Sequence, residues 1–168
     1  MRNRKTPTRA VIYPLPGPSC SPHYDRPMQA SFKHLGGQDN ARPWAFMFEG
    51  SYLTIEDWQH AVDQWCQTMD PLCYAVLAKQ SQDAEPEPVG LMSFMNIVPA
   101  HRRIELESII FSSALKRTRS ATEAFYLVMK HTFDNLGYSR LEWKANHLNK
   151  PSLAAPERLG FVFEGIFR

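Results

Sequence analysis

The stretch of residues 104–136 constrains the fold most, because an apolar segment, a short basic turn and an amphipathic segment follow one another there. Residues Ile104–Phe111 are rich in β-branched and aromatic side chains and predict a strand. From Ala121 to Leu136, apolar residues recur at helical spacing and predict a helix. The first turn of such a helix leaves backbone N–H groups unpaired, and the helix dipole adds partial positive charge. A strand, turn and helix in this order therefore predict an anion site at the turn.

The turn carries three cationic side chains, those of Lys116, Arg117 and Arg119, beside these N–H donors. A phosphate or pyrophosphate is the expected ligand, because charged donors form strong hydrogen bonds to phosphate oxygens. A solvated basic surface without a ligand is the alternative that the residues leave open. Nucleic acid is not expected as a partner, since the net charge is only +2 and the turn has neither interleaved aromatic residues nor a recognition motif.

The turn and the segments after it resemble the GNAT superfamily of N-acyltransferases, and most closely the branch related to ribosomal-protein alanine acetyltransferases. That branch carries Gln-Arg-Thr-x-x-Ala-Thr-Glu-Ala, and residues 116–124 here are Lys-Arg-Thr-Arg-Ser-Ala-Thr-Glu-Ala. Three later segments follow in the family's order and spacing, namely residues 136–144, Asn149-x-x-Ser152 and residues 157–165. Arg119 stands where the family pattern has glycine, so the backbone there must keep a negative φ.

The resemblance implies an α/β (α+β) fold with a GNAT-like mixed central sheet and helices on both faces. It also implies that acetyl-CoA, or another acyl-CoA, is the acyl donor. In the family, the strand before the turn and the strand after the helix splay apart, and the pantetheine arm lies between them. The residues implied to contact the acyl-CoA are Ile109, Ile110, Phe111, Lys116, Arg117, Thr118, Arg119, Ser120, Ala121, Thr122, Asn149 and Ser152. Among these, the N–H of Ile109 would also stabilise the oxyanion, and Asn149 is alternatively no more than a helix cap.

Two carboxylates are candidates for the general base. Glu105 and Glu107 point to the same face of the predicted strand, because side chains alternate along a strand. The resemblance matches Glu105 to the glutamate of a Glu-Ile-Gly motif at the family's acceptor site, while Glu107 replaces the glycine of that motif. We expect one of them, Glu105 more than Glu107, to accept the amine proton with a pKa raised by burial. A surface or salt-bridged pair is the alternative. Pro156 replaces the tyrosine that serves as general acid in many family members.

The resemblance places three aromatic side chains, those of Trp44, Phe46 and Phe48, on the acceptor side of the site, and simple core packing is the alternative for each. The expected function is transfer of an acetyl or other acyl group from acyl-CoA to the amine of a small molecule or peptide. The alternative is a fold that keeps its CoA groove but has lost or changed its chemistry, as a CoA-binding accessory protein or a repurposed biosynthetic enzyme.

The 168 residues predict one domain, residues 23–168, preceded by a mobile proline-rich tail at residues 1–22. That tail has no acidic residue, so a targeting segment is the alternative, and no strand is evident from Tyr13 to Tyr24. The three cysteines have no metal-binding or redox spacing, which favours a reducing, cytoplasmic location and no metal site. No apolar run approaches the roughly 20 residues that span a bilayer, so no membrane association is expected.

The remaining pattern completes the predicted sheet. It predicts a helix over Thr54–Met69 with Thr54 as its cap, strands over Tyr74–Ala78, Val89–Ile97 and Arg140–Ala145, a short helix from Asn149 to Gly160 and a last strand over Phe161–Phe167. Relatives in the family have a further strand beside the last one, and that pair helps to line the acceptor site. The resemblance implies that the sheet is shortened at the C-terminus here and lacks this strand, because the sequence stops at Arg168. We therefore expect the C-terminal edge of the sheet to be covered here by a second copy of the chain, in a homodimer, or by a partner protein.

Overall fold

A five-stranded mixed sheet forms the centre of the computed structural model, which describes residues 10–15, 31–79 and 84–168. The strands lie in chain order and are β1 (Ala10–Pro14), β2 (Leu72–Ala78), β3 (Glu87–Val98), β4 (Arg103–Phe111) and β5 (Arg140–Glu142). Neighbours from β1 to β4 are antiparallel, and β5 is parallel to β4. The parallel pair is joined through α3 (Arg119–Lys130), as a parallel connection requires a crossover.

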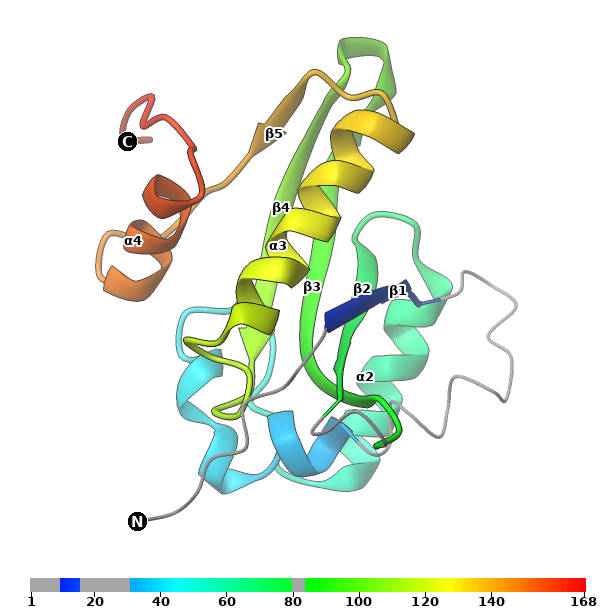
Figure 1. Cartoon of the computed structure of the whole chain (residues 1–168). Helices are drawn as coiled ribbons and strands as arrows, with labels where there is room; N and C mark the ends of the chain where they lie inside the picture. The colour runs from blue at the N-terminus through cyan, green and yellow to red at the C-terminus, as the bar shows by residue number, and fades with distance from the viewer. Residues whose placement is uncertain (1–9, 16–30, 80–83) are drawn as a thin grey trace.

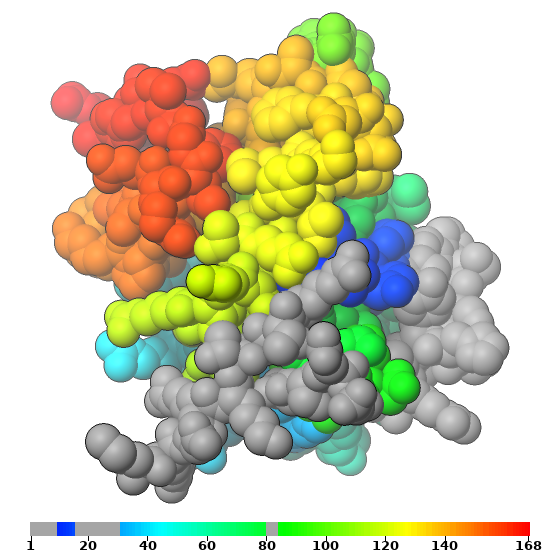
Figure 2. All heavy atoms as spheres, in the orientation of Figure 1, coloured from blue at the N-terminus to red at the C-terminus, as the bar shows by residue number. Residues whose placement is uncertain are grey.

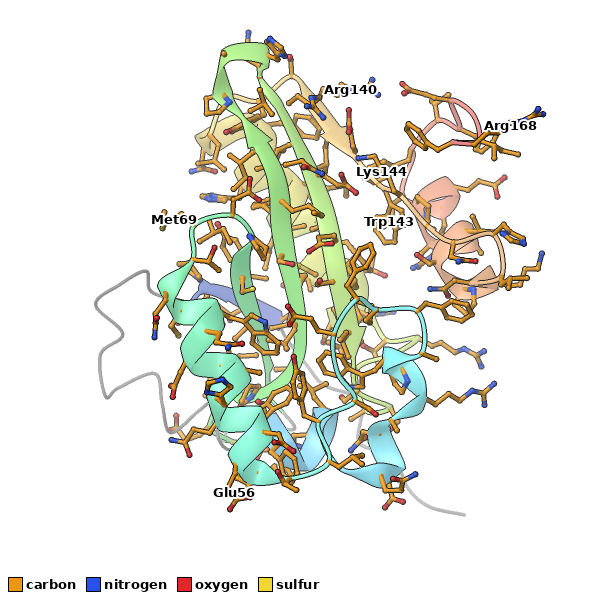
Figure 3. All side chains as sticks on the ribbon, turned by 180° about the vertical axis from the view of Figure 1, so that it is seen from behind. Glu56, Met69, Arg140, Trp143, Lys144 and Arg168 are labelled. Atoms are coloured by element: carbon orange, nitrogen blue, oxygen red, sulfur yellow. The ribbon has the colours of Figure 1, made fainter. Side chains whose placement is uncertain are left out.

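Helices cover both faces of this sheet (Figures 1 and 3). Helix α3 lies along one face, and α2 (Ile55–Gln67) lies against the other. A π-helical turn, η4 (His131–Asn135), extends α3, and α4 (Lys150–Arg158) follows β5. Short 3-10 turns are η1 (Gln38–Asn40), η2 (Arg42–Trp44) and η3 (Pro99–His101), and residues 31–35 are also helical. A mixed sheet with helices on both faces confirms the predicted fold class.

Two apolar clusters hold the layers together, one on each face of the sheet. Beneath α3, Phe94, Ile104 and Leu106 of the strands meet Phe125 and Val128 of the helix. The cluster on the other face joins the residues of α2 and its preceding loop to β2, β3 and β4, and includes Trp44, Trp58, Val62, Cys73, Ala75, Leu91 and Ile110. Burying one large apolar side chain contributes about 1.5–3 kcal/mol, so the two clusters make β3 and β4 a rigid platform.

The helix caps and most strands lie where the sequence predicts them. Thr54 caps α2, since its Oγ1 accepts the Asp57 N–H at 3.1 Å, and Asn149 caps α4. The strands predicted over Tyr74–Ala78 and Val89–Ile97 lie inside β2 and β3. Within the described ranges, no helix is long and apolar enough to cross a bilayer.

Strand β1 corrects the prediction of a mobile tail over residues 1–22. It pairs with β2 from Ala10 opposite Ala78 to Pro14 opposite Tyr74, and the Ala10 N–H donates to Glu123 Oε2 at 2.8 Å. The surrounding prolines and basic residues obscured this strand in the sequence. An edge strand tolerates proline, however, because one side of its backbone needs no partner. The rest of the predicted tail lies outside the described residues.

The C-terminal segment is a second correction. Phe161–Phe167 form no strand, and the strand predicted over Arg140–Ala145 ends at Glu142. The β-branched and aromatic residues of this segment favour an extended chain, but a strand also needs a partner for its backbone hydrogen bonds. No strand in the described part of the chain pairs with residues 161–167. Val162, Phe163, Ile166 and Phe167 are consequently 77–84% exposed.

Candidate active site

The edge of β4 is open where β4 and β5 separate. The two strands pair only over Arg103–Arg140, Ile104–Leu141 and Glu105–Glu142. Beyond this point β4 continues to Phe111, while the chain after Glu142 turns away toward α4 (Figure 1). The backbone of β4 therefore has no strand partner on this side from Leu106 to Phe111 within the described residues, and an extended ligand can bind there as an added strand.

A β-bulge lies in this open part of β4. Leu91 of β3 faces Ile110 and Ser93 faces Glu107, so β4 contains one residue more than β3 between these pairs. Ser108 has φ of 47°, a conformation that is uncommon outside glycine. Bulges change the direction of backbone and side-chain groups and occur frequently beside active sites. This bulge adjoins Ile109, the residue whose N–H is the predicted oxyanion donor.

The basic turn after β4 is held in one conformation by its own hydrogen bonds. Thr118 caps α3, because its Oγ1 accepts the Ala121 N–H at 3.1 Å and donates to the Leu115 carbonyl at 2.7 Å. Leu115 is fully buried, and its N–H and that of Lys116 both donate to the Ser112 carbonyl. Arg119 begins the helix without positive φ, as its place in the family pattern requires. The turn thus presents a fixed backbone to an anion.

The cations of this turn have no salt-bridge partner in the part of the chain that the structure describes. None of the ion pairs among the described residues involves Lys116, Arg117 or Arg119. The Lys116 side chain reaches solvent, but atoms packed around it partly desolvate the ammonium group and lower its pKa, and the nearby Arg42 charge lowers it further. An anion bound at the turn would relieve this repulsion.

Helix α4 follows β5 and lies on the open side of β4 (Figure 1). Asn149 Oδ1 accepts the Ser152 N–H at 3.4 Å, and Ser152 Oγ accepts from Trp143 Nε1 at 3.2 Å. The Trp143 ring packs against Phe125 of α3, with centroids 5.7 Å apart. Asn149 is therefore a helix cap. The cap uses only the side-chain oxygen, so the amide NH₂ group can still donate to a ligand.

Glu105 is buried and ion-paired. Its Oε2 accepts from Asn96 Nδ2 at 2.8 Å and also from Lys144 Nζ. Lys144 lies on the segment that leaves β5 (Figure 3) and bonds Glu142 at 3.2 Å as well. Asn96 is fixed in turn, because Asp70 accepts its backbone N–H at 3.0 Å. The charge of Glu105 is thus balanced, which corresponds to the salt-bridged alternative.

Glu107 has different surroundings. It is partly buried, belongs to no ion pair in the described part of the chain and accepts a hydrogen bond from Ser108 Oγ at 3.0 Å. Burial raises its pKa, the Ser108 bond lowers it, and the charges of Glu105, Glu49 and Asp70 raise it. The result is a carboxylate that is more basic than usual.

Cys73 shows which face of the sheet Glu107 occupies. Cys73 belongs to the apolar cluster on the α2 face, and burial together with the Glu107 and Glu49 charges raises the pKa of its thiol to about 12. The thiol therefore stays protonated and is no nucleophile. Glu107 lies close to Cys73 on this face, since both are opposite Ser93 of β3. Helix α2 covers only part of the face, and the ends of β3 and β4 near their connecting turn carry no helix on this side (Figure 3).

The three aromatic residues predicted on the acceptor side differ in exposure. Trp44 is 5% exposed, its Nε1 donates to the Leu35 carbonyl at 2.9 Å, and it packs edge-on against Trp58. Trp44 is therefore packed in the core, as the alternative expects. Phe46 and Phe48 are 46% and 98% exposed.

Glu49, whose charge acts on Glu107, and its hydrogen-bond partner Tyr52 are residues near the site that the sequence did not predict. Glu49 Oε2 accepts from Tyr52 Oη at 3.0 Å and from Trp65 Nε1 at 3.2 Å. Burial, followed by the Glu49 charge, raises the pKa of the Tyr52 phenol. No local pattern marks these residues, because their approach to β4 depends on the path of the loop before α2.

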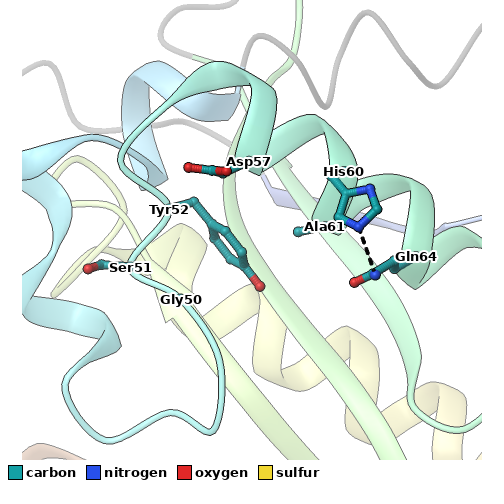
Figure 4. A pocket seen from close by; sticks show the side chains of 7 residues that line it. All are labelled: Gly50, Ser51, Tyr52, Asp57, His60, Ala61 and Gln64. Atoms are coloured by element: carbon teal, nitrogen blue, oxygen red, sulfur yellow. Dashed lines mark hydrogen bonds between the residues drawn. The ribbon is translucent and has the colours of Figure 1, made fainter.

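Tyr52 also lines a separate hollow beside α2 (Figure 4). Its lining residues are Gly50, Ser51, Tyr52, Asp57, His60, Ala61 and Gln64, and His60 Nε2 lies 3.0 Å from Gln64 Nε2. None of the residues predicted to bind a ligand lines this hollow, so it is separate from the open edge of β4 and the basic turn.

The chain is similar to known acetyltransferases in both sequence and structure. Residues 29–162 match the family model of the acetyltransferase (GNAT) domain. The crystal structure of a GCN5-related N-acetyltransferase from Brucella melitensis has 32% identity and a TM-score of 0.81, over 99% of this chain and 71% of that one. A probable GNAT-family acetyltransferase from Chromobacterium violaceum has 30% identity and a TM-score of 0.73, over 96% and 74% of the two chains.

A more distant structure shares the fold alone. Spermidine N-acetyltransferase from Vibrio cholerae, solved in complex with CoA and spermine, has 16% identity and a TM-score of 0.66, over 94% of this chain and 83% of that one. No curated protein sequence matches the chain.

Proposed function

Because the chain belongs to the GNAT family of acetyltransferases, we propose that it transfers an acetyl or other acyl group from acyl-CoA to the amine of a small molecule or peptide. The observation that carries this proposal is the open, bulged edge of β4 that leads directly into a capped basic turn. Both parts suit an acyl-CoA, whose pantetheine arm has amides and whose nucleotide has phosphates.

The residues that hold the acyl-CoA follow from this arrangement. The backbone of Ile109–Phe111 bonds the pantetheine amides at the edge of β4. Residues 116–122 take the pyrophosphate, while Asn149 and Ser152 face the pantetheine arm from α4. When bound, the acyl-CoA supplies an activated thioester carbonyl. Holding that carbonyl beside the amine supplies up to about 7–11 kcal/mol of the barrier.

Two groups of β4 would carry the chemistry. The Ile109 N–H donates to the carbonyl oxygen as negative charge develops on it, and such a donor contributes about 2.7–4 kcal/mol elsewhere. Glu107 accepts the proton of the attacking amine, directly or through water. As the new C–N bond forms, the C–S bond breaks, and the CoA sulfur leaves as a thiolate that takes a proton from solvent. The sequence favoured Glu105 for this role, but the Lys144 and Asn96 contacts of Glu105 favour Glu107 instead.

Calorimetry and thermal unfolding with acetyl-CoA test the first step. A ligand at 100 times its Kd stabilises the folded state by about 2.7 kcal/mol. We expect heat of binding and a melting temperature that rises by several degrees at saturation. An unchanged melting temperature together with no heat of binding would mean that the chain is no acyl-CoA-dependent transferase.

A second candidate function is acyl-CoA binding without transfer. Pro156 favours it, because Pro156 lies inside α4 where many family members carry a tyrosine acid, and proline has no group to donate. Release of free thiol from acetyl-CoA in the presence of a panel of amines distinguishes the two. Thiol release above the rate without an amine supports transfer, whereas binding without such release supports the second candidate.

A further inference from the structure

Arg42 projects from an element that is anchored in the core. It begins η2, where the Ala45 N–H donates to the Arg42 carbonyl at 3.3 Å and the Trp44 N–H donates to the Ala41 carbonyl at 3.0 Å. The buried Trp44 fixes this turn between Tyr52 and Trp58, with ring centroids 5.1 and 6.0 Å away. Element η2 also packs against β4. The backbone of Arg42 is thus held by the same core that carries the open edge of β4.

The Arg42 side chain lies beside the basic turn although the two are far apart in sequence. Burial lowers the pKa of Lys116, and the Arg42 charge lowers it further, so the two cations are close enough to interact. In the space-filling view, the turn before α3 projects at the surface next to the segment that contains η2 (Figure 2). Lys116, Arg117 and Arg119 belong to one short stretch of chain, and Arg42 approaches that stretch at Lys116.

No carboxylate balances these four charges in the described part of the chain. Arg42 is exposed and takes part in no ion pair or hydrogen bond there through its side chain. The acidic residue nearest to the turn in sequence, Glu123, accepts the Ala10 N–H of β1 instead. Like charges held together by a rigid core without a counter-charge repel one another, and a bound anion would remove this cost.

We propose that Arg42 is a phosphate ligand of the acyl-CoA and closes the basic turn from the side opposite α3. This inference rests on the proposed function. A guanidinium suits the role, because its planar set of donors forms bidentate hydrogen bonds to phosphate oxygens, and a rigid element keeps it oriented. The phosphates concerned are the pyrophosphate or the 3′-phosphate of the nucleotide, which offer Arg42 the same chemistry.

Calorimetry of acetyl-CoA binding to Arg42→Ala tests the proposal. We expect affinity to fall roughly 10- to 100-fold, as charge-assisted hydrogen bonds of this kind are lost. Arg42→Lys keeps the charge but not the fork, so its affinity should lie between those of Arg42→Ala and the wild type. Arg168→Ala is the matched control, since it removes an exposed arginine at the other end of the molecule (Figure 3) and should bind as the wild type does.

Truncated ligands locate the contact. Acetyl-dephospho-CoA lacks the 3′-phosphate. If Arg42→Ala still binds it more weakly than the wild type does, Arg42 contacts the pyrophosphate. If the two proteins bind it equally, Arg42 contacts the 3′-phosphate. Either result supports the proposal. Acetyl-pantetheine has neither group and should bind Arg42→Ala and wild type equally.

Three outcomes overturn the proposal. Wild-type affinity for acetyl-CoA in both Arg42 variants would show that Arg42 makes no contact. An equal loss with acetyl-pantetheine would show that the substitution acts through the fold. A wild-type protein that binds no acetyl-CoA would overturn the proposed function itself, and this inference with it.

Discussion

Glu105 and Glu107 are close together on β4, but their neighbours give them different chemistry. Glu105 is buried and shares its charge with Lys144, whereas Glu107 has no cationic partner in the described residues and a raised pKa. A general base works best when its pKa lies near the working pH, which favours Glu107. Glu105 instead joins β4 to the segment after β5 through its ion pair with Lys144.

We predict that Glu107→Gln lowers kcat on an accepted amine by roughly 10²–10⁴-fold. Glu107 must be ionised to accept a proton, so wild-type activity should rise with pH through the raised pKa of Glu107, and the variant should lose this limb of the pH–rate profile. Acetyl-CoA affinity should not change. Wild-type kcat in Glu107→Gln would exclude Glu107 as the base.

The same substitution should not destabilise the fold at neutral pH. The pKa of Glu107 is higher in the folded than in the unfolded state, so its stabilising contribution is present at low pH and is lost as pH rises through the folded pKa. At pH 7 the ionised Glu107 therefore opposes folding, and a neutral glutamine should leave the melting temperature equal or higher. A marked fall in melting temperature would indicate a structural role.

Glu105→Gln should show the opposite behaviour. The substitution removes the buried partner of Lys144, although Glu142 still contacts the lysine. We expect the free energy of unfolding to fall by about 1–3 kcal/mol. Urea unfolding of Glu105→Gln, Lys144→Met and the double variant measures their coupling as a double-mutant cycle. Additive effects of the two substitutions would mean that this ion pair does not join the strands.

Two helices have similar N-caps, and only one of these caps lies at the predicted phosphate site. Comparing them distinguishes the effect of a cap on stability from its effect on acetyl-CoA binding. Thr118 accepts the Ala121 N–H at the basic turn, and Thr54 accepts the Asp57 N–H at the start of α2, both at 3.1 Å. Loss of such a cap costs about 0.5–2 kcal/mol. We predict that Thr118→Ala and Thr54→Ala lose similar stability in chemical unfolding. Only Thr118→Ala should also weaken acetyl-CoA binding, because it loosens the turn that holds the phosphates.

Equal acetyl-CoA affinity in the two cap variants would argue against the basic turn as the phosphate site. Thr118→Ser provides a check, because serine keeps the capping oxygen and should restore both stability and affinity.

The whole molecule shows which features follow from local sequence and which do not. Strand β4, helix α3 and the caps at Thr54 and Asn149 depend on neighbouring residues, and the sequence predicts them. The pairing of β1 with β2, the Glu105–Lys144 ion pair and the approach of Glu49 to Glu107 depend on chain segments that meet only after folding. For the same reason, the sequence favoured Glu105 over Glu107, since burial and ion pairing cannot be read from a short motif such as Glu-Ile-Gly.

The C-terminal segment leads to a prediction about assembly. Val162, Phe163, Ile166 and Phe167 lie close together in sequence and are 77–84% exposed, and the open edge of β4 adjoins α4, from which this segment continues. Monomeric proteins rarely leave large apolar patches uncovered, and open sheet edges invite pairing with another chain. We therefore expect a second copy of the chain to cover this segment in solution.

Light scattering across a concentration series tests this assembly. The wild type should change from monomer to dimer as concentration rises, and Phe163→Glu with Phe167→Glu should shift the transition to higher concentration, because each glutamate places a charge in the apolar contact. If the second copy also walls the acceptor site, amine transfer per chain should increase with the dimer fraction, while acetyl-CoA affinity at the basic turn should stay constant. A strict monomer with full transfer activity would show that the exposed segment serves neither assembly nor catalysis.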